Sequence, residues 1–297
     1  MNKILWITNY ILSERLGGAE IDDNKLIAYL ILNKINVEIL SLKEIKAMPS
    51  SSRLIINTWD GKVILSNISQ IYKVNPSLIS EILNKKSYIK VEHGHAWLDN
   101  IIPDNVIIDI FARAKGIVFF SPGQLINHSK KGINTKNAII APPPFDRDQF
   151  YNTNTPALFG SGIYAGFISK KKGILNIFKF ALENKQYKID LFGPVEEKEL
   201  LVDMPTNVKY KGTVRPGEML ELYNQYTFAI HLPVIYESFS RFVAEAYLCG
   251  LEIKHNDNIG FFSYPWDFNE PDIVLDELIR GKEDFLYYIQ SKFNLKS

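Results

Sequence analysis

The 297-residue sequence predicts an α/β protein with two Rossmann-like halves, each containing a doubly wound parallel sheet. Three observations support this prediction. Short apolar runs with many β-branched residues alternate with helix-length segments along the chain. A proline-rich stretch, residues 142–156, interrupts this alternation, which then starts again. The chain is also long enough for two domains that each bury a core.

The first half contains apolar runs that we expect to be parallel strands. The first run is followed by the pair Gly17-Gly18 and by apolar residues at helical spacing, which predicts a strand, a glycine loop and a helix. Three consecutive prolines end the last run, because proline continues neither a strand nor a helix. The expected strands cover residues 3–9, 36–42, 53–59, 87–94, 115–121 and 137–141.

The second half repeats the pattern. The expected strands cover residues 163–167, 187–193, 208–214, 228–233 and 251–256, and the expected helices cover 171–184, 196–204, 216–226, 239–250 and 272–293. We therefore predict an N-terminal domain over residues 1–145, a linker over 146–156 and a C-terminal domain over 157–297, whose last helix packs back on the N-terminal domain. Ligands of such folds bind in the cleft between the carboxyl edges of the two sheets.

The composition is that of a soluble globular protein, with 46% hydrophobic and 23% charged residues. The net charge of +1 produces no global field that would attract nucleic acid or an anionic membrane. No apolar run approaches the roughly 20 residues of a membrane span, so at most peripheral membrane association is expected. The N-terminal run fits a strand better than a signal peptide, and the single cysteine, Cys249, excludes an internal disulfide. We expect a cytoplasmic protein.

The most informative stretch follows the expected strand over residues 228–233. Glu237 and Glu245 bracket the start of the next helix. Between them lie Ser238, Phe239, Ser240 and Arg241. The backbone N–H groups and the positive dipole end of a helix N-terminus attract anions. The pattern therefore favours a phosphorylated sugar whose hydroxyls the carboxylates would hold, although a helix cap and a solvated glutamate fit the same spacing.

The segment YESFSRFVAEAYLCG, residues 236–250, resembles the Glu-x7-Glu signature of the retaining GT-B glycosyltransferases of family 4, also described as glycosyl transferases group 1. The matching residues are Glu237, Phe239, Ser240, Glu245, Ala246 and Gly250. The resemblance implies a GT-B fold, with an acceptor-side N-terminal domain and a nucleotide-sugar-binding C-terminal domain. It also implies that Glu237 holds hydroxyls of the donor sugar, that Glu245 holds the ribose, and that Lys172 and the amides of residues 238–241 hold the diphosphate.

Two features of the first half extend the resemblance. The segment Gly17-Gly18-Ala19-Glu20 resembles the family's N-terminal loop, which implies that Gly18 faces the donor phosphates. His93, followed by Gly94, ends an expected strand where the family commonly has a histidine, which implies a role in catalysis beside Glu237. A tight turn and a packed histidine are the alternatives that these residues leave open.

Two features of the second half complete the resemblance. Gly166 and Lys172 match a family segment that binds the diphosphate, but Phe167 stands where the family has arginine. One phosphate contact is therefore missing or moved, with Arg241 or a neighbouring lysine as the replacement. The turn at Gly193 and the loop containing Val214 and Arg215 are where the resemblance places the nucleotide base.

No metal site is expected. Asp146 and Asp148 offer an Asp-x-Asp pattern, but they lie in the predicted linker, and the segment resembles the family's interdomain stretch instead. No cluster of His, Cys and Asp has metal-ligand spacing elsewhere.

The resemblance thus implies a metal-independent glycosyltransferase that needs no cofactor. It would move a hexosyl or related sugar, with retention of anomeric configuration, from a nucleotide-diphosphate sugar to a hydroxyl of a sugar, a lipid-linked glycan or another acceptor in carbohydrate biosynthesis. A UDP-sugar is slightly favoured as the donor.

Three alternatives stay open. The first is a GT-B nucleotide-sugar epimerase, and the second is a degenerate protein that binds a sugar nucleotide or a glycan without turnover, as Phe167 suggests. The third is a transferase for modified phage DNA bases, because Lys85-Lys86 and Lys130-Lys131 could contact phosphates. The overall charge balance argues against a nucleic-acid partner.

Overall fold

The computed structural model describes residues 3–47, 55–95, 97 and 100–295, and the chain forms two compact units. Unit 1 comprises Met1–Pro144 and Glu277–Ser297, and unit 2 comprises Phe145–Asp276. Residues 157–297 were predicted as one domain with a last helix that packs back. In the structure, the residues from Glu277 onward are part of unit 1.

Unit 1 contains a six-stranded sheet in the order β2-β1-β3-β4-β5-β6, and all its strand pairs are parallel. Its strands are β1 (Lys3–Thr8), β2 (Asn36–Ser41), β3 (Lys62–Leu65), β4 (Tyr88–Glu92), β5 (Gly116–Phe119) and β6 (Ala138–Ile140). The central strands are almost completely buried, as expected for a parallel sheet that is covered on both faces.

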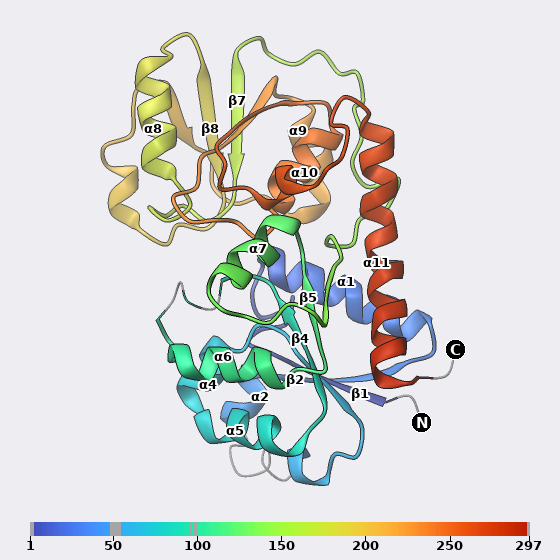
Figure 1. The fold of residues 1–297 in the computed structure, drawn as a ribbon. Coiled ribbons are helices and arrows are strands. Elements are labelled where there is room, and N and C mark those ends of the chain that lie inside the picture. Colours follow the sequence, from blue (N-terminus) through green and yellow to red (C-terminus); the bar gives the residue numbers. More distant parts are fainter. Residues whose placement is uncertain (1–2, 48–54, 96, 98–99, 296–297) are drawn as a thin grey trace. The chain divides into compact units, whose positions relative to one another are not determined.

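Helices cover both faces of this sheet (Figure 1). Alternate residues of β1 point to opposite faces, so Leu5 and Ile7 join a core with the helices α2, α4, α5 and α6, while Trp6 on the other face contacts Phe285 of α11. The helices of unit 1 include α1 (Gly18–Leu32), α2 (Leu42–Ala47), α4 (Ser69–Val74), α5 (Pro76–Lys85), α6 (Asp104–Arg113), α7 (Pro122–Lys130) and the end of α11 (Pro271–Phe293).

The strand predicted over residues 53–59 is wrong for the part that the structure describes. Residues 55–58 are helical, and the strand between β1 and β4 is β3, at residues 62–65. Both segments are short apolar runs, and periodicity does not distinguish a buried strand from a buried helical turn. Ile56 and Trp59 are buried in the same core that β3 helps to form. Burial therefore does not distinguish the helical segment from the strand either.

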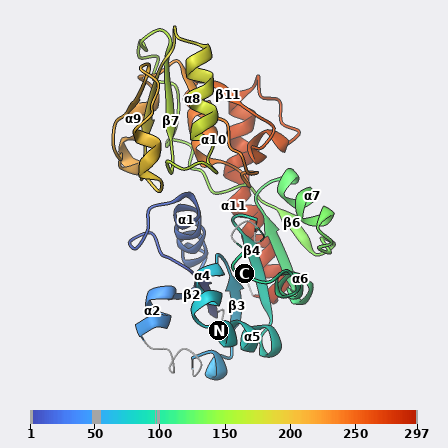
Figure 2. The ribbon, with the colours of Figure 1, turned by 90° about the vertical axis from the view of Figure 1, so that its left-hand side faces the viewer.

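Unit 2 contains a five-stranded parallel sheet in the order β11-β10-β7-β8-β9. Helix α8 lies on one face and faces the viewer in Figure 2, whereas α10 lies on the other face. Its strands are β7 (Ser161–Ala165), β8 (Lys188–Phe192), β9 (Val208–Tyr210), β10 (Phe228–His231) and β11 (Glu252–His255). Its helices are α8 (Ile174–Glu183), α9 (Met219–Tyr223), α10 (Arg241–Leu248) and the start of α11.

The helix predicted over residues 196–204 is reduced to a 3-10 turn, Lys198–Leu201. Leu200 is buried, but Val202 is 80% exposed, so the segment lacks the continuous apolar face that stabilises a longer helix. The parallel, doubly wound organisation predicted for both halves of the chain is otherwise confirmed.

Loops at the carboxyl edge of the unit 2 sheet pack backbone against backbone. Gly193, with φ +128°, follows β8, and a Cβ placed on it would lie 2.0 Å from the carbonyl oxygen of Gly166 after β7. Gly173, with φ +82°, precedes α8, and a Cβ there would lie 1.9 Å from the carbonyl oxygen of Leu232 after β10. Only glycine permits these approaches, which hold the loops after neighbouring strands together.

Candidate active site

An ion pair joins two of the predicted site residues at this edge. Lys172 Nζ lies 2.8 Å from each carboxylate oxygen of Glu237. The lysine comes from the loop after β7 and the glutamate from the loop after β10, and a hydrogen bond from Val234 N–H to the Lys171 carbonyl ties these loops together. The Lys172 and Glu237 side chains are 29% and 14% exposed, so the pair is accessible to a ligand.

The backbone around Glu237 is held by the segment that follows β11. Glu237 N–H donates to the Asn258 carbonyl at 2.8 Å, and Gly260 N–H donates to the Glu237 carbonyl at 2.9 Å. Phe261 N–H donates to the Phe239 carbonyl, and the two rings contact edge to face. Phe239 and Ser238 are therefore buried parts of a fixed loop.

The second glutamate of the motif lies in a polar cluster on α10. Arg241 Nε donates to one oxygen of Glu245 at 3.1 Å, and the Tyr223 hydroxyl donates to the other at 2.9 Å. The Arg241 guanidinium also lies over the Phe145 ring, 4.3 Å from its centroid. Burial, followed by the charge of Glu245, raises the pKa of Tyr223 well above its usual value. Tyr223 thus remains a neutral donor that fixes the Glu245 carboxylate.

Helix α10 begins beside both glutamates with an unusual residue. Ser240 has φ +77°, in the left-handed region that residues other than glycine seldom adopt, and its side chain makes no capping hydrogen bond to any residue that the structure describes. The first N–H groups of a helix lack helical acceptors and attract anions. Helix α10 follows β10 through this loop, so its N-terminus lies on the carboxyl-edge side of the sheet.

The residues predicted to contact the nucleotide base lie on the loops after β8 and β9. Gly193 N–H donates to the Gly212 carbonyl at 2.9 Å, which joins these loops. Val214 follows, and Arg215 precedes a 3-10 turn in which its N–H donates to Glu218. All the predicted residues of unit 2 therefore belong to loops at one sheet edge, or to the helix that begins there.

The structure also bears on the missing arginine at Phe167. Arg241 and the neighbouring lysines were the candidates to replace this arginine. Arg241 contacts Glu245 and Phe145. Lys170 forms ion pairs with Glu197 at 3.2 Å and Glu199 at 3.5 Å. Lys172, on the same loop after β7, contacts the motif glutamate Glu237.

The predicted residues of unit 1 lie at the carboxyl edge of its own sheet. Gly18 begins α1, and the preceding residue Gly17 is extended. His93 directly follows β4, and its Nε2 lies 2.7 Å from Asp23 Oδ1 of α1, with side-chain exposures of 6% and 5%. Burial opposes the charged imidazole, but Asp23, through its charge and hydrogen bond, and then Asp22 outweigh it, so the His93 pKa is raised.

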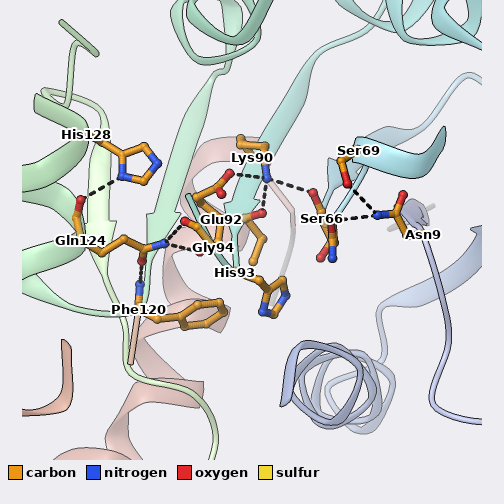
Figure 3. A network of polar contacts seen from close by, with 12 residues as sticks. Asn9, Ser66, Ser69, Lys90, Glu92, His93, Gly94, Phe120, Gln124 and His128 are labelled. Atoms are coloured by element: carbon orange, nitrogen blue, oxygen red, sulfur yellow. Dashed lines mark hydrogen bonds and ion pairs between the residues drawn. The ribbon is translucent and has the colours of Figure 1, made fainter. Parts of the chain in front are cut away.

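Further charged groups lie beside His93 in the polar network of Figure 3. Lys90 forms a buried ion pair with Glu92 at 2.9 Å and donates to the Ser66 carbonyl. Gln124 Nε2 donates to the Glu92 and Gly94 carbonyls at 2.7 and 2.9 Å, which fixes the chain on both sides of His93. Burial opposes ionisation of Glu92, but the charge and hydrogen bond of Lys90, together with His128 and His95, outweigh it and lower the pKa of that carboxyl.

Sequence reasoning missed Asp23, Lys90, Glu92 and Tyr223. A signal for the first three was present. Lys90 and Glu92 occupy an otherwise apolar buried strand, and Asp23 lies within the first turns of an apolar helix. Charged residues at such positions are buried only when they are paired. Nothing in the sequence around Tyr223 indicated its contact with Glu245.

His231 lies at the end of β10 and is 4% exposed. Its ring contacts those of Tyr164 and Phe242, and its Nδ1 has no hydrogen-bond partner among the described residues. Burial, only partly opposed by the Glu237 charge, lowers the His231 pKa from 6.5 to about 4.

This shift predicts acid sensitivity of unit 2. Well above pH 6.5 the His231 imidazole is neutral in both the folded and the unfolded chain. Its protonation then does not reduce the free energy of unfolding. As pH falls from 6.5 to about 4, only the unfolded chain takes up the proton, and the free energy of unfolding should decrease by about 3 kcal/mol. Urea denaturation of wild type and His231→Val at pH values between 7 and 4 measures this decrease in the free energy of unfolding. Equal losses in both proteins would contradict this assignment.

The described residues contain neither a metal cluster nor a membrane-spanning helix. Within these ranges, no set of three or more His, Cys, Asp or Glu side chains is placed to hold a metal ion. Every helix in the same ranges is too short or too polar to cross a lipid bilayer.

The two parallel-sheet units and the order of their elements define a GT-B fold. The Anabaena protein HepE, in a crystal structure with UDP and glucose, aligns over 98% of this chain and 95% of its own, with a TM-score of 0.65 and 14% identity. Sucrose-phosphate synthase from Thermosynechococcus elongatus aligns over 98% and 94%, with a TM-score of 0.68 and 13% identity.

A third similar structure is a glycosyltransferase from Rickettsia africae, which covers 98% of this chain and 94% of its own, with a TM-score of 0.62 and 15% identity. At such low identities the likeness establishes the fold. No protein-family model matches the sequence. No curated protein matches it either.

Proposed function

We propose that this protein is a retaining, metal-independent glycosyltransferase that uses a nucleotide-diphosphate sugar, with a UDP-sugar as the first candidate. The observation that carries the proposal is the Lys172–Glu237 ion pair beside the α10 N-terminus, with Glu245 on the same helix. A cation, helix amides and carboxylates at one sheet edge match the diphosphate and hydroxyls of such a donor. The HepE structures with UDP, glucose and UDP-glucose support the same class of ligand.

In the proposed reaction, the bond between the sugar C1 and the diphosphate oxygen breaks, and a bond forms between C1 and the acceptor oxygen on the same face. The acceptor proton passes to the leaving diphosphate. Lys172 and the α10 amides stabilise the negative charge that grows on this group, and Glu237 holds sugar hydroxyls. Glu245, fixed by Arg241 and Tyr223, holds the ribose.

A panel of donors tests this proposal. UDP-glucose, UDP-galactose, UDP-N-acetylglucosamine, GDP-mannose and ADP-glucose are incubated with the purified protein in EDTA, and release of the nucleotide is followed. We expect one donor to be hydrolysed slowly without an acceptor and faster with one, and proton NMR of the glycoside to show the anomeric configuration of the donor. Inversion, or activity only with added Mg²⁺ or Mn²⁺, would contradict the proposed chemistry.

A specific observation keeps a second function open. Phe167 replaces the expected arginine, and Arg241 and Lys170 already have partners within unit 2. A protein with a weakened diphosphate site would bind a sugar nucleotide without turning it over. In the panel this function predicts thermal stabilisation by a donor but no release of nucleotide at any protein concentration.

A further inference from the structure

The strongest unassigned feature is the set of contacts that holds His93 at the carboxyl edge of the unit 1 sheet. Asp23 accepts hydrogen bonds from three sides: from His93 Nε2 at 2.7 Å, from Ser66 Oγ at 2.8 Å and from Trp6 Nε1 at 3.1 Å. The donors come from β1 and from the residues that directly follow β3 and β4. The Asp23 carboxylate is therefore fixed in place before any ligand binds.

An aromatic contact also holds the His93 ring. Phe120, which directly follows β5, lies with its ring centroid 4.7 Å from that of His93 (Figure 3). The imidazole thus contacts both an aromatic ring and a carboxylate that accepts further hydrogen bonds from Ser66 and Trp6. These contacts determine the orientation of the ring. Because Nε2 is bound to Asp23, only Nδ1 can bind a substrate.

The partner of Nε2 determines what the second nitrogen can do. An ionised carboxylate only accepts hydrogen bonds, so Nε2 must carry a proton whether the ring is neutral or charged. Nδ1 then accepts in the neutral ring and donates in the charged ring. The charged groups around the ring are Asp23, Asp22 and Glu20 of α1 and Lys90 of β4, and their balance with burial raises the His93 pKa. The raised pKa widens the pH range in which the ring is charged and Nδ1–H is a donor.

We propose that Asp23 is a positioning residue for the transfer reaction, which binds His93 Nε2 and thereby reserves Nδ1–H to donate a hydrogen bond to a substrate oxygen. This inference rests on the proposed function. It assigns His93 as a donor toward a hydroxyl or anionic oxygen, and the pH dependence described below separates this role from that of a base that takes the acceptor proton.

The experiment compares wild type with Asp23→Asn, using the donor that the panel identifies. The chain has five histidines, and the spectrum of His93→Gln assigns the His93 imidazole proton signal. We expect wild-type kcat to be highest at low pH and to fall as pH rises through the His93 pKa. In Asp23→Asn both the NMR pKa and this alkaline limb should move to lower pH, and kcat at pH 7.5 should fall about a hundredfold.

Two comparisons separate positioning from general damage to the fold. Ser66→Ala removes one hydrogen bond to Asp23 but keeps the carboxylate charge, so the His93 pKa should stay raised, unlike in Asp23→Asn. The His128 signal is an internal control, because its charged neighbours are Glu92 and Lys90 rather than Asp23. Asp23→Glu, which restores the charge, should recover part of the alkaline limb.

Three outcomes would overturn the proposal. The first is a His93 pKa that does not change in Asp23→Asn, because it would show that Asp23 and His93 are not paired. The second is a rate that rises with pH through the His93 pKa, which assigns Nδ1 as an acceptor. The third is a normal NMR shift in a protein that neither binds nor hydrolyses any donor. That result would contradict the proposed function and therefore the role of Asp23 in transfer. The effect of Asp23 on the His93 pKa would still be established.

Discussion

Replacement of Glu237 by Gln is expected to lower kcat for transfer by about 10²- to 10³-fold while the protein stays folded. Glutamine has nearly the same shape, so the backbone bonds of residue 237 to Asn258 and Gly260 should persist. The negative charge that holds Lys172 through two 2.8 Å contacts is lost, together with a strong acceptor for sugar hydroxyls. Steady-state kinetics and thermal unfolding measure the two expectations separately.

The matched control is Glu252→Gln. Glu252 also pairs with a lysine of unit 2, Lys254, but it lies at the start of β11, where the sheet presents its amino edge, and its side chain is 65% exposed. Solvated pairs of this kind contribute little, so kcat should stay within about twofold of wild type. If Glu237→Gln turned over like Glu252→Gln, the role assigned to Glu237 would be wrong.

Replacement of Gly173 by Ala is expected to have the largest effect on stability. Its φ of +82° disfavours any L side chain, and the new Cβ would lie 1.9 Å from a backbone oxygen of Leu232, which cannot move without shifting the β10 loop. Such combined strain and overlap costs about 4 kcal/mol or more. The melting temperature should fall by about 10 °C, or the protein should fail to accumulate in soluble form.

Gly212→Ala isolates the contribution of the clash. Gly212 has a similar φ of +90°, but no described atom lies within 4 Å of a Cβ placed there. It should cost only the left-handed conformation, about 1–2 kcal/mol, or a fall of roughly 2–6 °C. Equal melting temperatures for the two variants would show that the β7 and β10 loops do not pack as closely as the structure indicates.

Much of the fold could be predicted from the sequence because the β-branched runs and the helix-length segments between them are local signals. The strand at residues 62–65 could not, because its four residues are too few to show a period, and the neighbouring run at residues 55–59 is equally apolar. Burial on both faces, which selects β3 as a strand, is a property of the assembled sheet. The prediction therefore failed where tertiary contacts determine the local conformation.

The candidate site was predictable only in part, for a related reason. The Glu-x7-Glu pattern located Glu237 and Glu245, whose roles remain predictions. The pairing of Glu237 with Lys172 links residues 65 positions apart and depends on the packing of two loops. The carboxylate that binds His93 lies 70 positions away, on the helix α1. Spacing in the sequence carries no information about either contact.

Binding of UDP is the measurement that tests the central claim most directly. Calorimetric titrations of UDP and uridine into wild type and Lys172→Met, in EDTA, separate the diphosphate contribution from that of the base. We predict that UDP binds wild type more tightly than uridine, and that Lys172→Met loses about tenfold or more of the UDP affinity with uridine binding unchanged. Equal affinities for UDP and uridine, or an unaltered UDP affinity in Lys172→Met, would contradict a diphosphate site at the Lys172–Glu237 pair.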